Sequence, residues 1–160
     1  GRVDGVLYHD GWGTQRAGFF SNEMFRNQIM PATSRFLKFV KDQGKFIELH
    51  SCGKNVQYVP EMIEMGIDMW TPQAEINDPD ELYEKYGDKM TFAFFVNIPP
   101  QADEKEIRKI VRDFVDHYGA KGRCMPCFMT DMSNPAQSEA AHDELYHYSL
   151  EYYNKLYHRD

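Results

Sequence analysis

The chain has 160 residues, of which 42% are apolar and 14% aromatic, and its formal net charge at pH 7 is −7. A chain this acidic lacks the basic surface that binds phosphate backbones, which argues against nucleic acid as the main partner. No run approaches the roughly 18 apolar residues of a transmembrane helix, and the length predicts one domain over residues 1–160.

The first segments alternate between strand and helix. The stretch VDGVLYHD (3–10) predicts a strand, and KFIELHS (45–51) predicts a second one. Between them, residues 21–44 predict a helix with Ser21 as its N-cap and a kink or break at Pro31.

The middle of the chain continues this alternation. Residues 56–66 predict a short helix and residues 67–72 a third strand. Residues 78–87 predict a helix capped by Asp78, and residues 90–97 a fourth strand.

The last segments complete five such units. Residues 103–119 carry apolar residues at helical spacing, which predicts an amphipathic helix. A fifth strand is predicted over 123–129 although Pro126 interrupts it, and a final helix over 138–158.

Strands that alternate with helices predict an α/β fold with a parallel sheet and helical crossovers. On the second strand, Glu48, His50 and Cys52 share one face, while Ile47 and Leu49 share the other. An apolar outer face with polar residues at the C-terminal end of the other face is typical of a (β/α)8 TIM-type barrel. Five units do not close a barrel of eight, so we expect a C-terminal portion of a barrel, or a piece completed by another chain. The polar residues expected at the strand ends are Asp10, His50, Cys52, Gln73, Asn97 and Cys127.

The first candidate for chemistry is the His-Ser-Cys sequence at the end of the second strand. His50 and Cys52 offer a nitrogen and a sulfur ligand for zinc from one rigid element. Cys127, or else Cys124, would supply the third ligand from a later strand. The alternative is a buried cysteine beside a hydrogen-bonded histidine.

The second candidate is YHDGWGTQ, Tyr8 to Gln15. Asp10 ends a strand and is expected to face the site, as a general base or hydrogen-bond anchor, with Trp12 and Gln15 following on a glycine-rich loop. The alternative is an aspartate that satisfies turn amides. The three cysteines are an odd number, which favours reduced thiols in the cytoplasm over a disulfide framework.

Several segments together resemble the second half of the uroporphyrinogen decarboxylase superfamily. They are YHDGWGTQ, MPATSRFLKFVKDQGKFIELHSCGKN, MIEMGIDMWTPQ and DELYEKYGDKMTF, and the resemblance extends over roughly residues 3–155. The superfamily fold is a (β/α)8 barrel. Its members include the cofactor-free porphyrinogen decarboxylases of heme biosynthesis and zinc-dependent methyltransferases that work with corrinoid proteins.

The resemblance implies the methyltransferase branch, because that branch binds zinc through an H-x-C pair and a distant cysteine. It implies a methyl group moving between a small methylated substrate or thiol and a corrinoid held by a partner protein. The open alternatives are a uroporphyrinogen decarboxylase and a non-catalytic half-barrel that assembles with a missing N-terminal half or as a homo-oligomer. The expected site comprises His50, Cys52 and Cys127 as metal ligands, Asp10 and Gln15 as catalytic residues, and Tyr8, Trp12, Gln73 and Asn97 around the substrate.

Overall fold

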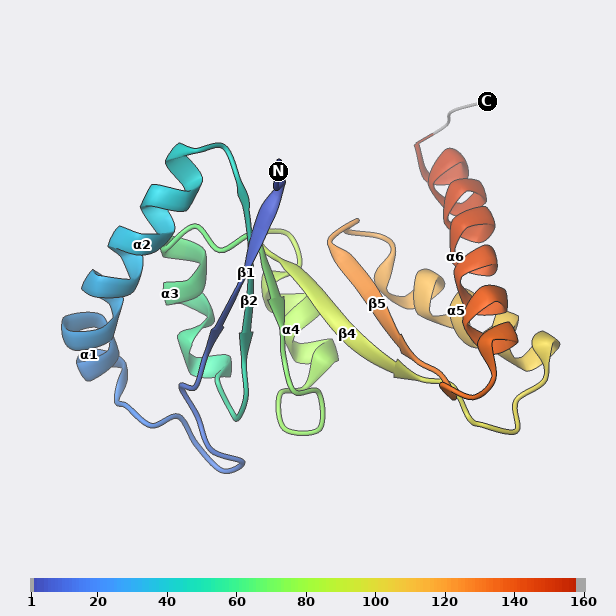
Figure 1. Cartoon of the computed structure of the whole chain (residues 1–160), viewed down its shortest axis with the longest axis horizontal. Helices are drawn as coiled ribbons and strands as arrows, with labels where there is room; N and C mark the ends of the chain where they lie inside the picture. Colours follow the sequence, from blue (N-terminus) through green and yellow to red (C-terminus); the bar gives the residue numbers. More distant parts are fainter. Residues whose placement is uncertain (1, 158–160) are drawn as a thin grey trace. The chain divides into compact units, whose positions relative to one another are not determined.

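The computed structural model describes residues 2–157 and has the predicted α/β architecture (Figure 1). Its five strands form one sheet in the order β1-β2-β3-β4-β5, and the pairings of β1 with β2, β2 with β3 and β3 with β4 are parallel. Strands that follow one another both in sequence and in the sheet build the wall of a β/α barrel. The strands are β1 (Gly5–Asp10), β2 (Phe46–Ser51), β3 (Met69–Thr71), β4 (Thr91–Asn97) and β5 (Cys124–Met129).

The helices lie where the sequence predicts them. Ser21 accepts a hydrogen bond from the Met24 amide, and Asp78 accepts from the amides of Asp80 and Glu81, which confirms both predicted N-caps. The last helix begins earlier than predicted, with Pro135 in its first turn, and residue 158 of the predicted range lies outside the described residues. The helices are α1 (Asn22–Met24), the π-helix η1 (Phe25–Ile29), α2 (Met30–Asp42), the 3₁₀-helix η2 (Val56–Tyr58), α3 (Val59–Glu64), α4 (Pro79–Tyr86), α5 (Glu104–Tyr118) and α6 (Pro135–Leu156).

The break predicted at Pro31 takes the form of a π-helical turn. The Met30 amide donates to the Phe25 carbonyl, and Pro31 follows in the first turn of α2. Proline has no N–H, and its ring crowds the carbonyl four residues earlier, so a wider turn before Pro31 relieves the helix.

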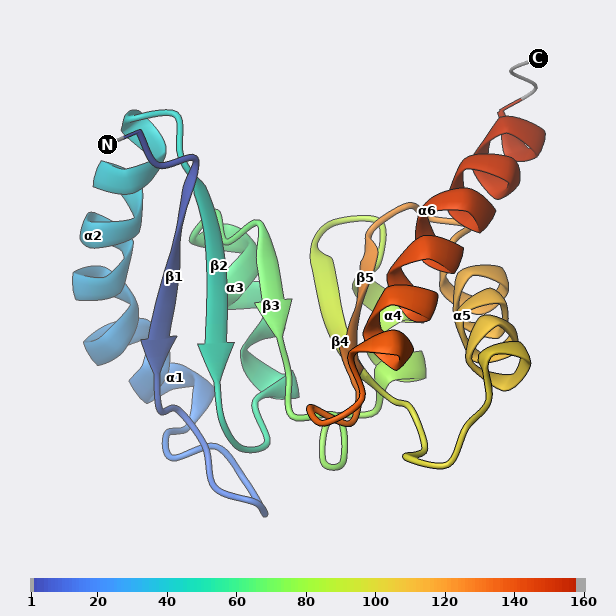
Figure 2. The ribbon, with the colours of Figure 1, turned by 45° about the vertical axis from the view of Figure 1, so that its right-hand side comes forward.

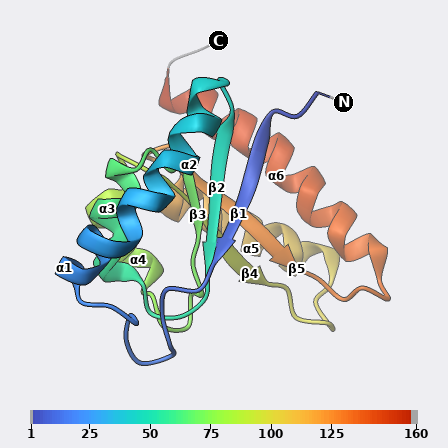
Figure 3. The same ribbon diagram turned by 60° about the vertical axis from the view of Figure 1, so that its left-hand side comes forward.

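The chain divides into two compact units, the first ending at Ala93 and the second starting at Phe94. In the first unit, β1, β2 and β3 run in the same direction (Figure 2). The in-register side chains Leu49, Trp70 and Phe92 are buried on the face that α2 and α3 cover (Figure 3). The opposite face carries Leu7, 53% exposed, and Phe46, 43% exposed.

The second unit is built by α5, α6, β5 and the end of β4. Its core contains Ile107 and Val111 of α5 and Ala141 of α6, with Phe128 of β5 packed against them. Among the described residues, no helix has the length and apolar character needed to cross a membrane.

Candidate functional site

The loops after β1, β2 and β3 meet at the C-terminal edge of the first unit. Because the three strands are parallel, their carboxyl ends share this edge, and Figure 2 shows the loops that follow them at the same end. Six predicted residues lie on these loops or within the last two residues of the strands before them: Asp10, Trp12, Gln15, His50, Cys52 and Gln73.

His50 is held in a defined orientation. Its Nδ1 lies 3.0 Å from the Thr71 carbonyl oxygen and its Nε2 lies 3.2 Å from Cys52 Sγ. A carbonyl oxygen only accepts hydrogen bonds, so Nδ1 carries the proton and the lone pair of Nε2 points to the thiol. This is the tautomer in which histidine binds metals through Nε2.

The His50–Cys52 pair fits two positions of a zinc site. Tetrahedral zinc with ordinary Zn–N and Zn–S bonds places its ligand atoms about 3.5 Å apart, close to the observed 3.2 Å. Cys52 is exposed and forms no disulfide. Among residues 2–157, no group of three or more His, Cys, Asp or Glu side chains is close enough to hold a metal ion. The structure therefore supplies a pair, and Cys127, which belongs to the second unit, stays a predicted third ligand.

The two cysteines of β5 differ in environment. Cys124 shares a strand face with Phe128, which packs against the core of the second unit, and burial raises the pKa of Cys124 to about 12. Cys127 lies on the other face with Met125 and Met129, which are 42% and 52% exposed. Since a metal ligand must be a thiolate, these environments favour Cys127 over Cys124.

The chain bends sharply after Cys52. Gly53 has φ +91°, and a Cβ there would lie 2.3 Å from the carbonyl carbon of Gly13. A Cβ on Gly13 would lie 2.6 Å from Asn55 Oδ1. The two glycines therefore allow the loops after β1 and β2 to pack backbone against backbone.

Sequence reasoning missed two buried amides beneath this bend, Asn55 and Asn77. Asn55 Nδ2 donates to Ser51 Oγ at 3.0 Å and to the Cys52 carbonyl at 2.8 Å. Asn77 Nδ2 donates to the carbonyls of Gly53 and Gln73, both at 2.9 Å. The available signal was asparagine in the loops after β2 and β3, where its side chain often bonds the backbone.

The register places His9, and not Asp10, on the face of His50. His9 pairs with His50, with ring centroids 5.3 Å apart, whereas Asp10 pairs with the buried Ser51. The expectation that Asp10 faces the site is wrong, because side chains alternate along β1. His9 was not predicted as a site residue.

Asp10 anchors the end of β1. Its carboxylate accepts a hydrogen bond from the Tyr8 hydroxyl at 2.7 Å and another from the Gly11 amide at 2.8 Å. Burial, reinforced by the bond to Asp10, raises the pKa of Tyr8 to about 12. The Tyr8 ring contacts Phe36 of α2. Both side chains thus hold β1 and its loop in place.

Trp12 lies in the core instead of lining the substrate space. It is 1% exposed, and its ring packs edge-on against Phe25 with centroids 4.9 Å apart. Its amide donates to Ser51 Oγ at 3.1 Å. The glycine-rich sequence suggested a rim position for Trp12. The indole is buried instead, and its burial stabilises the loop. Asn97, at the end of β4, is exposed and belongs to the second unit.

Gln15 and Gln73 join the loops after β1 and β3. Their amides exchange two hydrogen bonds of 3.1 and 3.2 Å, and the Gly53 amide donates to Gln73 Oε1 at 3.3 Å. Beside them lies an open recess of about 570 Å³, which is also lined by Arg16 and Lys54. The recess has two cations, Arg16 and Lys54, and two carboxylates, Glu75 and Asp78, in its wall.

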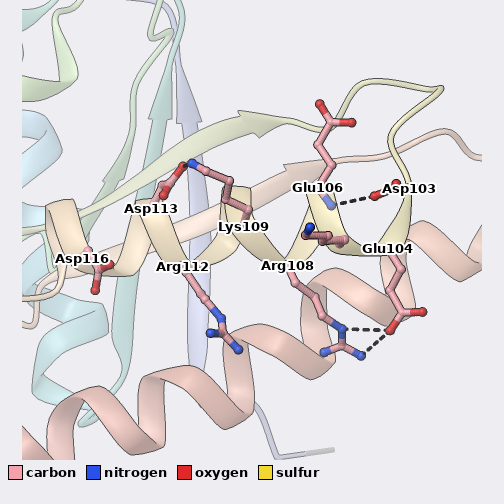
Figure 4. Close-up of a pocket in the computed structure, with 9 residues that line it drawn as sticks. Asp103, Glu104, Glu106, Arg108, Lys109, Arg112, Asp113 and Asp116 are labelled. Carbon is pink, nitrogen blue, oxygen red and sulfur yellow. Dashed lines mark hydrogen bonds and ion pairs between the residues drawn. The ribbon is translucent and has the colours of Figure 1, made fainter.

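A larger hollow of about 910 Å³ lies along α5 in the second unit (Figure 4). Its wall consists of charged residues that pair with one another, such as Arg108 with Glu104 and Lys109 with Asp113. None of the predicted site residues lines it. We therefore assign the candidate site to the edge formed by β1, β2 and β3.

Comparison with solved structures supports the fold. The chain resembles Yersinia pestis DHPS with a pterine-sulfa conjugate, a protein of the TIM-barrel type, with 15% identity and a TM-score of 0.51, over 88% of this chain and 58% of that one. A second likeness, to a putative 2-pyrone-4,6-dicarboxylic acid hydrolase from Pseudomonas putida, has 18% identity and a TM-score of 0.46, over 88% of this chain and 56% of that one. The chain thus spans less than two thirds of either protein.

Sequence comparison gives the family. No curated protein shows a significant match to the chain. The family model described as uroporphyrinogen decarboxylase (URO-D) matches residues 3–123, which is more than half of the 160 residues and includes His50 and Cys52 but stops short of Cys127. With its parallel sheet and its segment of barrel wall, the chain belongs to the uroporphyrinogen decarboxylase family.

Proposed function

We propose that the chain is the metal-holding part of a zinc-dependent methyltransferase that works with a corrinoid protein. His50, Cys52 and Cys127 hold the zinc, and a methyl group moves between a small methylated substrate or thiol and the corrinoid. The observation that carries this proposal is His50 Nε2 facing Cys52 Sγ at 3.2 Å while Nδ1 bonds the Thr71 carbonyl. Three reduced thiols suit the cytoplasm, where we place the protein.

The chain's own residues bind and orient in this proposal. Bound zinc supplies Lewis acidity toward a substrate sulfur or oxygen. The paired amides of Gln15 and Gln73 present hydrogen-bonding edges beside the Cys52 loop, where they orient the substrate. Asp10 acts through the end of β1, since its carboxylate is engaged by Tyr8 and Gly11.

Zinc content of the purified protein tests the proposal. We expect about one zinc per chain in the wild type, and its loss in the Cys52→Ala and Cys127→Ala variants. Cys124→Ala is the matched control, because this buried thiol lies on the opposite face of β5 and should leave zinc in place. Stoichiometric zinc in Cys52→Ala would sink the assignment.

A second candidate is decarboxylation of a porphyrinogen without any metal. Arg16 and Lys54 in the wall of the recess beside Gln15 favour it, because they would suit the carboxylates of such a substrate, while Glu75 and Asp78 of the same wall oppose it. This function would be supported over methyl transfer if metal-free protein releases carbon dioxide from a porphyrinogen. Arg16→Ala should then raise the KM of this reaction at least about tenfold.

The third candidate is a half-barrel that acts only in assembly, with a missing half-barrel or a second copy as partner. The exposed side chains of Leu7 and Phe46 on the uncovered sheet face favour a covering partner. Elution of a well-folded monomer in size exclusion would count against this need.

A further inference from the structure

The position of Cys52 depends on the loop that follows β2, and one buried side chain holds this loop from below. Cys52 is the first residue beyond the strand, so the sheet ladder that fixes His50 does not fix it. Asn55 is fully buried, and its Nδ2 donates to the Cys52 carbonyl at 2.8 Å and to Ser51 Oγ at 3.0 Å. The carbonyls of Ser51 and Gly53 lie within 3.2 and 3.3 Å of the same nitrogen. The two N–H groups of one side-chain amide thus face acceptors on Ser51, Cys52 and Gly53.

A second buried amide ties this bend to the next loop. Asn77 is 1% exposed, and its Oδ1 accepts a hydrogen bond from the backbone amide of Asn55 at 2.9 Å. Its Nδ2 donates to the carbonyls of Gly53 and Gln73. Burying polar amides is unfavourable unless they are bonded, so two of them at one bend indicate a backbone that must keep one conformation.

The amide of Asn55 is oriented for donation. Its Oδ1 is buried and has no hydrogen-bond partner among the described residues, whereas its nitrogen faces several acceptors. The unbonded oxygen lies against Gly13, where a Cβ would approach it to 2.6 Å. The side chain of Asn55 thus holds the Cys52 loop through its nitrogen, while its oxygen stays without a hydrogen bond.

We propose that Asn55 and Asn77 are positioning residues that hold Cys52 Sγ against His50 Nε2 before any ligand binds. They contact neither ligand atom and act through the carbonyls of Cys52 and Gly53. Their effect on metal binding rests on the proposed function, but their effect on the His50–Cys52 pair does not.

The first test uses metal-free protein and the alkylation rate of Cys52 by iodoacetamide, with the modified peptide identified by mass spectrometry. The rate is measured at one pH in the wild type, His50→Ala, Asn55→Ala and the double variant. We expect His50→Ala to change the rate at least about threefold in the wild type and to have little effect in the Asn55→Ala background. An equal effect of His50→Ala in both backgrounds, or none in the wild type, overturns the proposal.

The second test measures the affinity for Co²⁺ from the cobalt–thiolate absorption band. We expect binding about 10- to 100-fold weaker in Asn55→Ala and Asn77→Ala. Tyr58→Phe is the matched control, because it removes a buried hydroxyl of the same unit, which donates to the Phe20 carbonyl at 2.6 Å. This control should bind within about twofold of the wild type.

The outcomes separate the two proposals. If cobalt binds the wild type and is lost in Cys52→Ala, but binds the asparagine variants as tightly as Tyr58→Phe, the positioning proposal is overturned and the proposed function stands. If the wild type binds no cobalt, the metal assignment fails, and the alkylation cycle alone decides the role of Asn55.

Discussion

Single residues decide whether the loop after β2 can form. Gly53 adopts φ +91° and lies against the backbone of Gly13. Gly44 also has a positive φ, +67°, but nothing lies within 4 Å of where its Cβ would be. Comparing Gly53 with Gly44 therefore separates the cost of a left-handed backbone from the cost of a close contact.

We predict that Gly53→Ala destabilises the fold by about 2–4 kcal/mol, because it adds a backbone clash to conformational strain of about 1 kcal/mol. Gly44→Ala should cost only the strain. Urea unfolding of both variants checks this, and equal losses of stability would contradict the close approach of the two loops.

At this scale the sequence predicts chemical groups better than their partners. Strand alternation, carried one residue past the end of β2, predicts a common side for His50 and Cys52, and His50 Nε2 lies 3.2 Å from Cys52 Sγ. The same alternation puts His9, and not Asp10, beside them. Asn55 and Asn77 resemble ordinary turn residues in the sequence, because their acceptors are carbonyls that come together only in the folded chain.

At the scale of elements, an ion-pair network joins α5 to α6. The Glu144 side chain is 5% exposed and lies between Arg108 and Arg112 (Figure 4 shows both arginines on α5). Burial alone would raise the pKa of Glu144, but the bonds from Arg108 and Arg112 outweigh it and lower the pKa below its usual value. The network therefore stabilises the second unit above the pKa of an unfolded glutamate, and this contribution is lost as the pH falls through the folded value.

We predict that Glu144→Gln lowers the free energy of unfolding by about 1–3 kcal/mol at pH 7, and by progressively less as the pH falls below the pKa of an unfolded glutamate. Glu151→Gln is the control, because this exposed partner of Lys155 should change stability by less than about 0.5 kcal/mol. Chemical unfolding across this pH range gives both values, and a Glu144→Gln effect that does not depend on pH would contradict the network.

The elements themselves could be predicted closely, apart from the π-helix η1. Strand alternation, caps and the spacing of apolar residues locate the other helices and the strands to within a few residues. A π-turn adds one residue without a compositional signal of its own, so the periodicity of residues 21–44 predicts only a break near Pro31.

At the scale of the whole molecule, the sheet has a helix-covered face and an uncovered one in the first unit. Phe46 and Ile47 are neighbours on β2 that point to opposite faces, with exposed fractions of 43% and 0%. The alternation of strands and helices predicts this α/β arrangement. Cys127 stays a predicted ligand, because it belongs to the second unit and spacing along the chain does not encode which distant side chains come together.

We predict that Ile47→Ala costs about 2–5 kcal/mol of unfolding free energy and that Phe46→Ala costs less than about 1.5 kcal/mol. If a second half-barrel covers the open face, Phe46→Ala should also weaken association in sedimentation experiments, whereas Ile47→Ala should not. Equal stability costs would mean that Phe46 is already covered within one chain.

The opposite orientations of Cys124 and Cys127 on β5 have a redox consequence. Residues three apart on a strand have Cα atoms about 10 Å apart, whereas a disulfide requires less than about 7 Å. The C-x-x-C sequence therefore cannot close into a ring while β5 is intact. An oxidant that reaches the folded protein therefore cannot pair these two thiols with each other, and any disulfide between Cys124 and Cys127 would report that β5 had unfolded.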